Sequence, residues 1–282
     1  MSPRLTSWLM MLPGLLWLGL LMVVPCLLIF VLIFFERGIY GGVDWNAATL
    51  DNIARAFDPL YLSIFWDSAK IAGLATFIAL LIGYPAAYAI AKAPEERQTA
   101  LLFLAMLPFW TNYLIRTYAW IVLLNPAGLI NNLLAAIGLD RLPLLYNPFA
   151  VVLGLVYAYT PFVILAIYAA LQRLDPSLPE ASRDLGASAL TTFWRITLPL
   201  TASGVAAGAV FVFVLSIGNF VTPDLLGGGK FQMVGNLIYD QFLSARDWPF
   251  GATLSALLIA LMMLVLFAQA LATGRARGER HG

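Results

Sequence analysis

Few residues of this 282-residue chain could carry out chemistry, and their spacing forms no catalytic or metal site. The chain has one histidine, His281, and one cysteine, Cys26, which lies within an apolar run. No group of histidine, cysteine and carboxylate residues has the spacing of metal ligands. The segment GGGKF at 227–231 lacks the spacing and the hydroxyl of the phosphate-binding loop G-x-x-x-x-G-K-[ST]. The sequence therefore predicts no catalytic residue, no metal and no cofactor in this chain.

The composition indicates an integral membrane protein. Hydrophobic residues make up 61% of the chain and charged residues only 11%, which is far from the balance of a soluble domain. The net charge is +1 and the basic residues are scattered along the chain. Because nucleic-acid binding needs a clustered basic surface, we expect no nucleic-acid partner.

Long apolar stretches predict an all-α integral membrane protein with a six-transmembrane-helix bundle. A helix needs about 20 apolar residues to cross the hydrocarbon layer of a bilayer. The stretches that meet this requirement lie near 8–35, 68–91, 98–124, 148–171, 201–222 and 250–273. We therefore expect a transmembrane domain over 8–273, with short tails at 1–7 and 274–282.

The distribution of Lys and Arg predicts that both tails are cytoplasmic, since cytoplasmic loops carry the excess of these residues. With the N-terminus inside, the inner segments hold nine of them: Arg4, Lys92, Arg97, Arg173, Arg183, Arg195, Arg275, Arg277 and Arg280. The outer segments hold five: Arg37, Arg55, Arg141, Lys230 and Arg246. The polar insert between the fourth and fifth stretches then faces the cytoplasm.

This insert, 177–199, has the pattern of a bent helical pair. Ser177 and Glu180 match the S-x-x-E capping box that begins a helix, and Pro179 falls in its first turn. Gly186 supplies the left-handed residue that commonly ends a helix, and a second helix is expected from near Ser188. The mixed charge of the first helix favours a protein partner over a lipid surface, whose helices are usually rich in Lys and Arg.

The insert also resembles a known motif. Its residues Glu180, Ala181, Gly186, Ile196, Leu198 and Pro199 match the pattern EAA-x3-G-x9-I-x-LP, with Ser182 in place of the second alanine. This is the EAA motif of permease subunits of ABC importers. The resemblance implies a fold of the type I importer kind and a cytoplasmic ATPase partner. The residues expected to dock on that ATPase are Glu180, Ala181, Ser182, Asp184, Gly186, Ile196, Leu198 and Pro199.

Other segments narrow the resemblance. PFWTNYLIRTYAW at 108–120, RDLGAS at 183–188 and RDWPFGA at 246–252 resemble the spermidine/putrescine permease family, from about residue 60 to the last span. This resemblance implies a polyamine importer in a bacterial inner membrane. Its expected partners are a second homologous permease subunit, an ABC ATPase dimer that hydrolyses the ATP, a periplasmic solute-binding protein and the lipid membrane.

A polyamine is a protonated amine, which carboxylates and aromatic faces bind. The candidates for a translocation path are Trp110, Asn112, Tyr157, Tyr159, Asp224 and Asp240, although aromatic residues at helical spacing are also common packing residues. Arg116 lies four residues after Asn112 and would repel the substrate. We therefore expect Arg116 to be structural and to pair with Asp67.

Three alternatives remain open at this stage. The chain could serve an importer of another small solute, such as an opine, an organophosphonate or another small cation, because the docking motif is shared among such permeases. An ion-coupled secondary transporter would need acidic residues in mid-membrane, and no Asp or Glu lies in the middle of a predicted span. An intramembrane enzyme would need a nucleophile and base or a metal site, which the sequence lacks.

Overall fold

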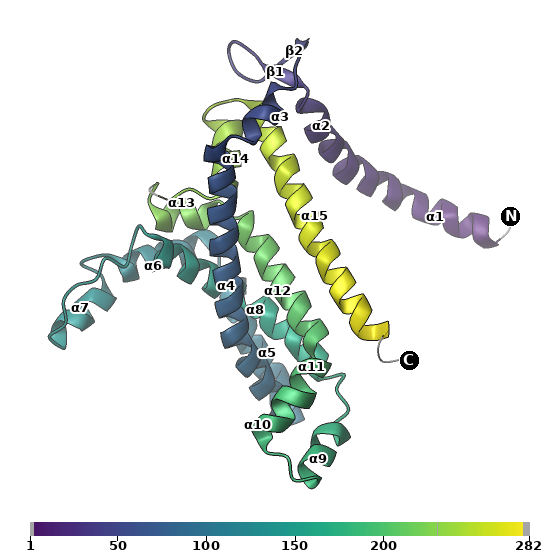
Figure 1. The fold of residues 1–282 in the computed structure, drawn as a ribbon, viewed down its shortest axis with the longest axis vertical. Helices are drawn as coiled ribbons and strands as arrows, with labels where there is room; N and C mark the ends of the chain where they lie inside the picture. Colours follow the sequence, from purple (N-terminus) through teal and green to yellow (C-terminus); the bar gives the residue numbers. More distant parts are fainter. Residues whose placement is uncertain (1–2, 230, 279–282) are drawn as a thin grey trace. The chain divides into compact units, whose positions relative to one another are not determined.

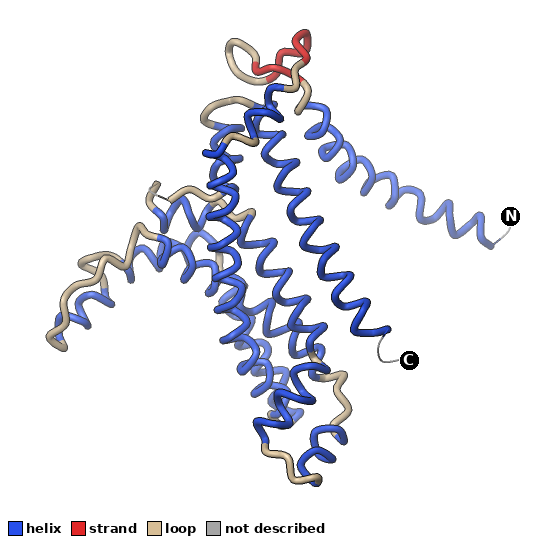
Figure 2. Tube along the Cα trace, in the orientation of Figure 1, coloured by secondary structure: helices blue, strands red, loops and turns tan. Residues whose placement is uncertain are grey.

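Helices dominate the structure because the backbone of a membrane-spanning chain must satisfy its hydrogen bonds within each segment. The computed structural model describes residues 3–229 and 231–278 (Figures 1 and 2). Lys230, His281 and the end of the predicted C-terminal tail lie outside the described residues, as does the start of the N-terminal tail. The chain forms two compact units, one of Met1–Ser63 with Leu237–Leu261 and one of Ile64–Asn236 with Met262–Gly282.

The first unit begins with an apolar helical segment and a hairpin. Its elements are α1 (Pro3–Leu18), the π-helical turn η1 (Gly19–Val23), α2 (Val24–Leu32), β1 (Phe35–Arg37), β2 (Val43–Ala48) and α3 (Asp51–Ala56). The start of α4 (Pro59–Lys92), most of α14 (Val234–Leu243) and the first half of α15 (Trp248–Gly278) complete it. Strands β1 and β2 pair antiparallel, with Glu36 opposite Asp44 and an irregularity between Phe35 and Glu36. The all-α prediction missed this small sheet.

The second unit is built around α8. Its elements are the rest of α4, then α5 (Glu95–Trp110), α6 (Tyr113–Leu124), α7 (Leu129–Ala136), α8 (Pro148–Leu171), α9 (Ser177–Asp184), α10 (Ala189–Thr192), η2 (Phe193–Thr197), α11 (Leu198–Leu200), α12 (Ala202–Ile217) and α13 (Val221–Gly227). Helix α12 packs closely on α8, because a Cβ at Gly204 would lie only 2.5 Å from the Cβ of Ala170. The core of this unit therefore lies along α8, whose apolar window is 61% buried.

Within the described residues, five helices are long and apolar enough to cross a membrane: Met10–Leu32, Pro59–Lys92, Tyr113–Ala136, Pro148–Leu171 and Trp248–Leu271. The count reaches six if the segments Ala189–Leu200 and Ala202–Ile217, which meet at 66°, form one span. The window Met10–Leu32 has none of its side chains buried. This first helix therefore leaves most of its apolar surface open to lipid or to another chain.

The predicted third span is wrong as one continuous helix. The chain leaves the helical conformation at Thr111, whose ψ is 150°, and a new helix begins at Tyr113. The Asn112 side chain accepts hydrogen bonds from the backbone N–H groups of Leu114 (2.9 Å) and Ile115 (3.3 Å). Asn112 thus caps α6, and its cap is the physical reason for the break.

Candidate coupling segment and translocation residues

The coupling segment, defined here as residues 175–201, begins with an aspartate cap. Asp175 Oδ1 accepts a hydrogen bond of 3.0 Å from the backbone N–H of Ser177, the first residue of α9. This hydrogen bond stabilises the carboxylate and so holds the pKa of Asp175 below its ordinary value. The predicted capping box of Ser177 and Glu180 is therefore wrong, because Ser177 lies inside the helix and Asp175 supplies the acceptor.

The corner of the segment matches the prediction. Gly186 has a φ of +86°, the left-handed conformation that glycine adopts most easily, and its N–H donates to the carbonyl of Arg183. Ser188 then caps α10, since its hydroxyl accepts from the backbone N–H of Thr191 at 3.2 Å. The hydroxyls of Ser182 and Thr192 lie 3.0 Å apart and join the two short helices. The insert is thus a bent helical pair at the end of α8 and α12 (Figure 1).

The second helix continues to a sharp bend at Thr201. It runs through α10, the π-helical turn η2 and α11, and α12 then leaves at 66°. Thr201 is fully buried, and its hydroxyl donates to the carbonyl of Thr197 at 2.8 Å. The Tyr84 hydroxyl of α4 lies 2.8 Å from the same Thr201 oxygen. The bend is therefore held by its own chain and by α4.

The predicted docking residues lie largely on the surface of this segment. Glu180, Ala181, Asp184, Gly186 and Pro199 are exposed, whereas Ser182, Ile196 and Leu198 are half-buried. Leu198 packs at the edge of the core cluster formed by α4, α8 and α12.

Three large apolar side chains of the same segment are exposed and were not among the predicted docking residues. Leu185 is 89% exposed, Leu190 67% and Trp194 59%. Exposed apolar side chains of this size beside polar residues are typical of a contact surface for another protein or for a membrane. The signal that could have identified them is their presence within an otherwise polar insert. We call the exposed docking residues together with Leu185, Leu190 and Trp194 the coupling face.

A polar node joins α6, α8 and the break between α12 and α13. Asn219 Nδ2 donates to the hydroxyls of Tyr113 and Tyr159, each at 2.6 Å. The Tyr113 hydroxyl also hydrogen-bonds to Thr222, whose backbone N–H donates to Asn219 Oδ1 at 2.9 Å. These groups satisfy one another in a half-buried site where an unpaired polar group would be costly. Tyr159, predicted as a path residue, is therefore part of a structural node. The role of Asn219 in this node was not predicted.

Arg116 is structural, as expected, but its predicted partner is wrong. Its guanidinium donates to the carbonyl of Pro108 at 2.6 Å and lies 5.3 Å from the ring centroid of Tyr113 and 5.8 Å from that of Tyr157. Asp67 instead pairs with Lys70 at 2.7 Å, three residues along the same helix. The Pro108 carbonyl, next to the break at Thr111, also accepts from the Thr111 hydroxyl at 2.7 Å.

The remaining predicted path residues differ in surroundings. Trp110, the last residue of α5, is 73% exposed, and its ring meets that of Phe103 at 5.4 Å. Tyr157 is 37% exposed. Asp224 is exposed in the first turn of α13, and Asp240 is half-buried in α14, which belongs to the first unit.

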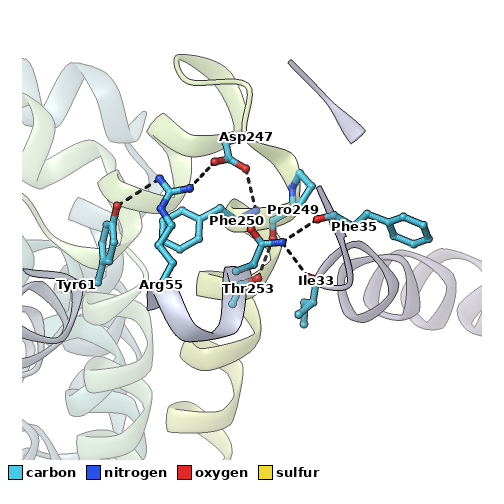
Figure 3. Close-up of polar contacts among 9 residues, drawn as sticks. Ile33, Phe35, Arg55, Tyr61, Asp247, Pro249, Phe250 and Thr253 are labelled. Carbon is cyan, nitrogen blue, oxygen red and sulfur yellow. Dashed lines mark hydrogen bonds and ion pairs between the residues drawn. The ribbon is translucent and has the colours of Figure 1, made fainter. Parts of the chain in front are cut away.

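In the first unit, Arg55 of α3 joins the start of α15 (Figure 3). Its guanidinium lies 2.8 Å from the nearly buried Asp247, 3.4 Å from the hydroxyl of Tyr61 and 3.8 Å from the ring centroid of Phe250. Burial alone would lower the pKa of Arg55, but the hydrogen bonds to Asp247 and Tyr61 outweigh it and raise the pKa. Asp247 also accepts from the backbone N–H of Phe250 at 3.2 Å, so it caps α15.

The hairpin is tied to the same region. The Asn52 side chain of α3 donates to the carbonyls of Ile33 (3.1 Å) and Phe35 (2.8 Å). The backbone N–H of Gly42 donates to the carbonyl of Arg246 at 2.7 Å. Helix α3, the hairpin and the start of α15 thus form one connected cap within this unit.

Comparisons with known proteins agree with this architecture. A family model described as "Binding-protein-dependent transport system inner membrane component" matches residues 99–277. The chain is 42% identical over 255 residues to a spermidine/putrescine transport system permease protein PotB of Haemophilus influenzae, covering 89% of this chain and 88% of that protein. It is 42% identical over 252 residues to PotB of Escherichia coli, covering 89% and 91%.

A solved structure has a similar fold. It is the crystal structure of a bacterial alginate ABC transporter in complex with an alginate pentasaccharide-bound periplasmic protein. One of its chains aligns with 94% of this chain and 92% of its own length, at a TM-score of 0.77 and 18% identity. At this identity the similarity concerns the fold alone.

Proposed function

This chain belongs to the family of binding-protein-dependent transport system inner membrane components, and we propose that it is the permease subunit of an ATP-driven importer of spermidine or putrescine. The observation that carries this proposal is the 42% identity, over 89% of the chain, to relatives named as spermidine/putrescine permeases. The chain is a multi-pass inner membrane protein and a transport subunit, so the ATP is hydrolysed by another polypeptide.

The proposed assembly contains a second homologous permease, a cytoplasmic ABC ATPase dimer and a soluble periplasmic binding protein. The family description supports the binding protein, because transport in this family depends on one. The unburied apolar surface of Met10–Leu32 is consistent with a second membrane subunit beside it. We also propose that both termini lie in the cytoplasm, which the distribution of Lys and Arg supports.

The coupling face is the proposed ATPase-docking surface. Its exposed polar residues Glu180 and Asp184 lie on the same short segment as the exposed apolar residues Leu185, Leu190 and Trp194. Apolar anchors within a polar rim are typical of protein interfaces. Gly186 supports this role by fixing the angle between the two helices, so that the face keeps one shape.

Two residues are the proposed contacts for the protonated amine. The exposed ring of Trp110 offers an aromatic face, and the exposed carboxylate of Asp224 offers a negative charge. Tyr157 is a weaker candidate, because the guanidinium of Arg116 already lies 5.8 Å from its ring centroid. Asn112 and Tyr159 are weaker candidates, because a helix cap and the polar node already use their hydrogen-bonding groups. Asp240 remains a candidate without a stronger argument.

The proposed mechanism links these parts. The binding protein delivers the polyamine to the outer end of the path, where aromatic faces and carboxylates replace part of its hydration. ATP-driven closure of the ATPase dimer moves the coupling segment. Helices α8 and α12, which leave the ends of that segment, then change the access of the path from the outer to the inner side.

The test is the ATPase activity of the complete assembly in lipid. The activity should rise when a spermidine-loaded binding protein is added and should remain basal with the unloaded binding protein. Activity that ignores the spermidine-loaded protein but responds to a binding protein loaded with another solute would contradict the polyamine assignment and keep the permease assignment.

A further inference from the structure

The bend between the coupling segment and α12 is fixed by a buried chain of two hydroxyls. Thr201 uses its own hydroxyl proton to donate to the carbonyl of Thr197 at 2.8 Å. The Thr201 oxygen can then only accept from the Tyr84 hydroxyl, which lies 2.8 Å away. Thr201 is 0% exposed and Tyr84 8% exposed, so both residues are buried. A directed link therefore runs from α4 to the last turn before the bend.

The same tyrosine also packs on the π-helical turn. The ring centroid of Phe193, the first residue of η2, lies 5.3 Å from that of Tyr84 and 6.1 Å from that of Tyr88. π-Helical turns are rare and frequent at functional sites, because they interrupt the regular hydrogen-bond ladder of a helix. Ring contacts of this kind are weakly directional and permit sliding. The hydrogen bond to Thr201, by contrast, fixes the orientation of the bend relative to α4.

We propose that Tyr84 is a positioning residue that transmits the movement of the coupling segment to α4. This inference rests on the proposed function, in which the segment docks on the ATPase. The covalent chain already carries movement of the segment into α12 and α8. The Tyr84 hydroxyl adds α4, so that three helices move together. Without the hydroxyl, the segment can turn while α4 stays in place, and ATP hydrolysis becomes partly uncoupled from transport.

The chain offers matched control variants. Tyr84→Phe removes only the hydroxyl that contacts Thr201. Tyr88→Phe removes the hydroxyl of a tyrosine on the same helix that contacts the same Phe193 ring, and this hydroxyl makes no hydrogen bond within the described residues. Thr201→Val removes the acceptor at nearly constant volume, whereas Thr201→Ser keeps it. Two pairs of variants thus separate the hydrogen bond from packing.

The experiment measures polyamine transported per ATP hydrolysed by the complete assembly in proteoliposomes, with the spermidine-loaded binding protein present. Tyr84→Phe and Thr201→Val should lower this ratio about two- to tenfold, the range that corresponds to one net hydrogen bond. Tyr88→Phe and Thr201→Ser should keep the wild-type ratio. The double variant Tyr84→Phe with Thr201→Val should be no worse than Thr201→Val alone, because the Tyr84 hydroxyl has lost its partner once the Thr201 hydroxyl is absent.

The outcomes separate this inference from its alternatives. If Tyr84→Phe lowers the thermal stability of the assembly but keeps the transport ratio per folded complex, the hydroxyl is merely structural and the inference is overturned. Wild-type ratios in both Tyr84→Phe and Thr201→Val overturn it as well, while the proposed function stands. An unmodified assembly that does not respond to any loaded binding protein contradicts the proposed function itself.

Discussion

The corner at Gly186 allows a clean test of the coupling face. A Cβ at this position would meet nothing within 4 Å, so Gly186→Ala creates no clash. The only cost is the backbone conformation, because φ is +86° and an L-residue with a Cβ is strained there. That strain is about 1–2 kcal/mol for alanine. Asparagine tolerates the left-handed region better, so Gly186→Asn is the matched variant.

The affinity for the ATPase dimer should follow this strain. If docking requires the observed corner, Gly186→Ala should weaken the binding of the ATPase to the permease pair about 5- to 30-fold, and Gly186→Asn should weaken it less. Gly186→Pro should abolish docking and uptake, because proline fixes φ near −65° and removes the N–H that donates to Arg183. Membrane insertion should be unchanged in all three variants.

The assay titrates purified ATPase against the permease pair in nanodiscs and reads the dissociation constant. Gly186→Ala binding as tightly as the unmodified chain would refute the reasoning, since the corner would then not be needed for docking. An equal loss in the alanine and asparagine variants would also refute it, because the effect would not follow backbone strain.

Three further outcomes follow from the structure. Asn219→Ala should lower the free energy of unfolding by about 1–3 kcal/mol, because it removes the hydrogen bonds to the half-buried Tyr113 and Tyr159 hydroxyls. Asn132→Ala, which removes an exposed hydrogen bond, should change this free energy by less than about 0.5 kcal/mol. Thermal unfolding of the purified chain compares the two variants. Asp247→Ala should lower the free energy of unfolding by about 1 kcal/mol more than Asp247→Asn, because asparagine keeps the cap of α15. The ion pair with the half-exposed Arg55, which both variants remove, contributes little. Equal unfolding midpoints of the two variants would contradict the capping role. Trp110→Ala should raise the apparent KM for polyamine uptake about two- to fivefold, because it removes a cation–π contact with the substrate. Trp110→Phe keeps an aromatic ring and should raise the KM less. An unchanged KM in both variants would show that Trp110 is not part of the translocation path.

The features that the sequence predicted are local ones. The corner of the coupling segment depends on Gly186 and on the Ser188 cap, and both act on residues within four positions along the chain. The helical spans depend on apolar length alone. The docking motif lies on one continuous segment, so the proximity of its residues does not depend on the tertiary packing of the rest of the chain. How they dock remains a proposal.

The failed predictions involve competing or distant partners. The residues from Ser177 to Glu180 match the S-x-x-E pattern, but Asp175, two residues before Ser177, supplies the acceptor instead. The third span was predicted as continuous because a single asparagine within an apolar run does not by itself indicate a helix break. In the structure Asn112 caps a new helix. The guanidinium of Arg116 donates to the Pro108 carbonyl next to the helix break. The spacing of residues in the sequence does not predict this hydrogen bond.

The polar node and the hydrogen bond between Tyr84 and Thr201 could not be predicted either, because their partners are far apart in the sequence. Asn219 meets Tyr113 and Tyr159 from positions 106 and 60 residues away, and Tyr84 meets Thr201 across 117 residues. Nothing in the spacing of one sequence indicates such pairs. The hairpin was missed because strands of three and six residues carry too little alternation to stand out.

The proposed function requires this chain to carry polyamines as part of an ATP-driven importer. The most direct measurement is uptake of radiolabelled spermidine into proteoliposomes that contain the complete assembly, with ATP inside and the binding protein outside. We expect spermidine to accumulate above its outside concentration. This accumulation should need both ATP and the binding protein and should persist when ion gradients are collapsed. Uptake that continues without ATP and stops when an ion gradient is collapsed would contradict it.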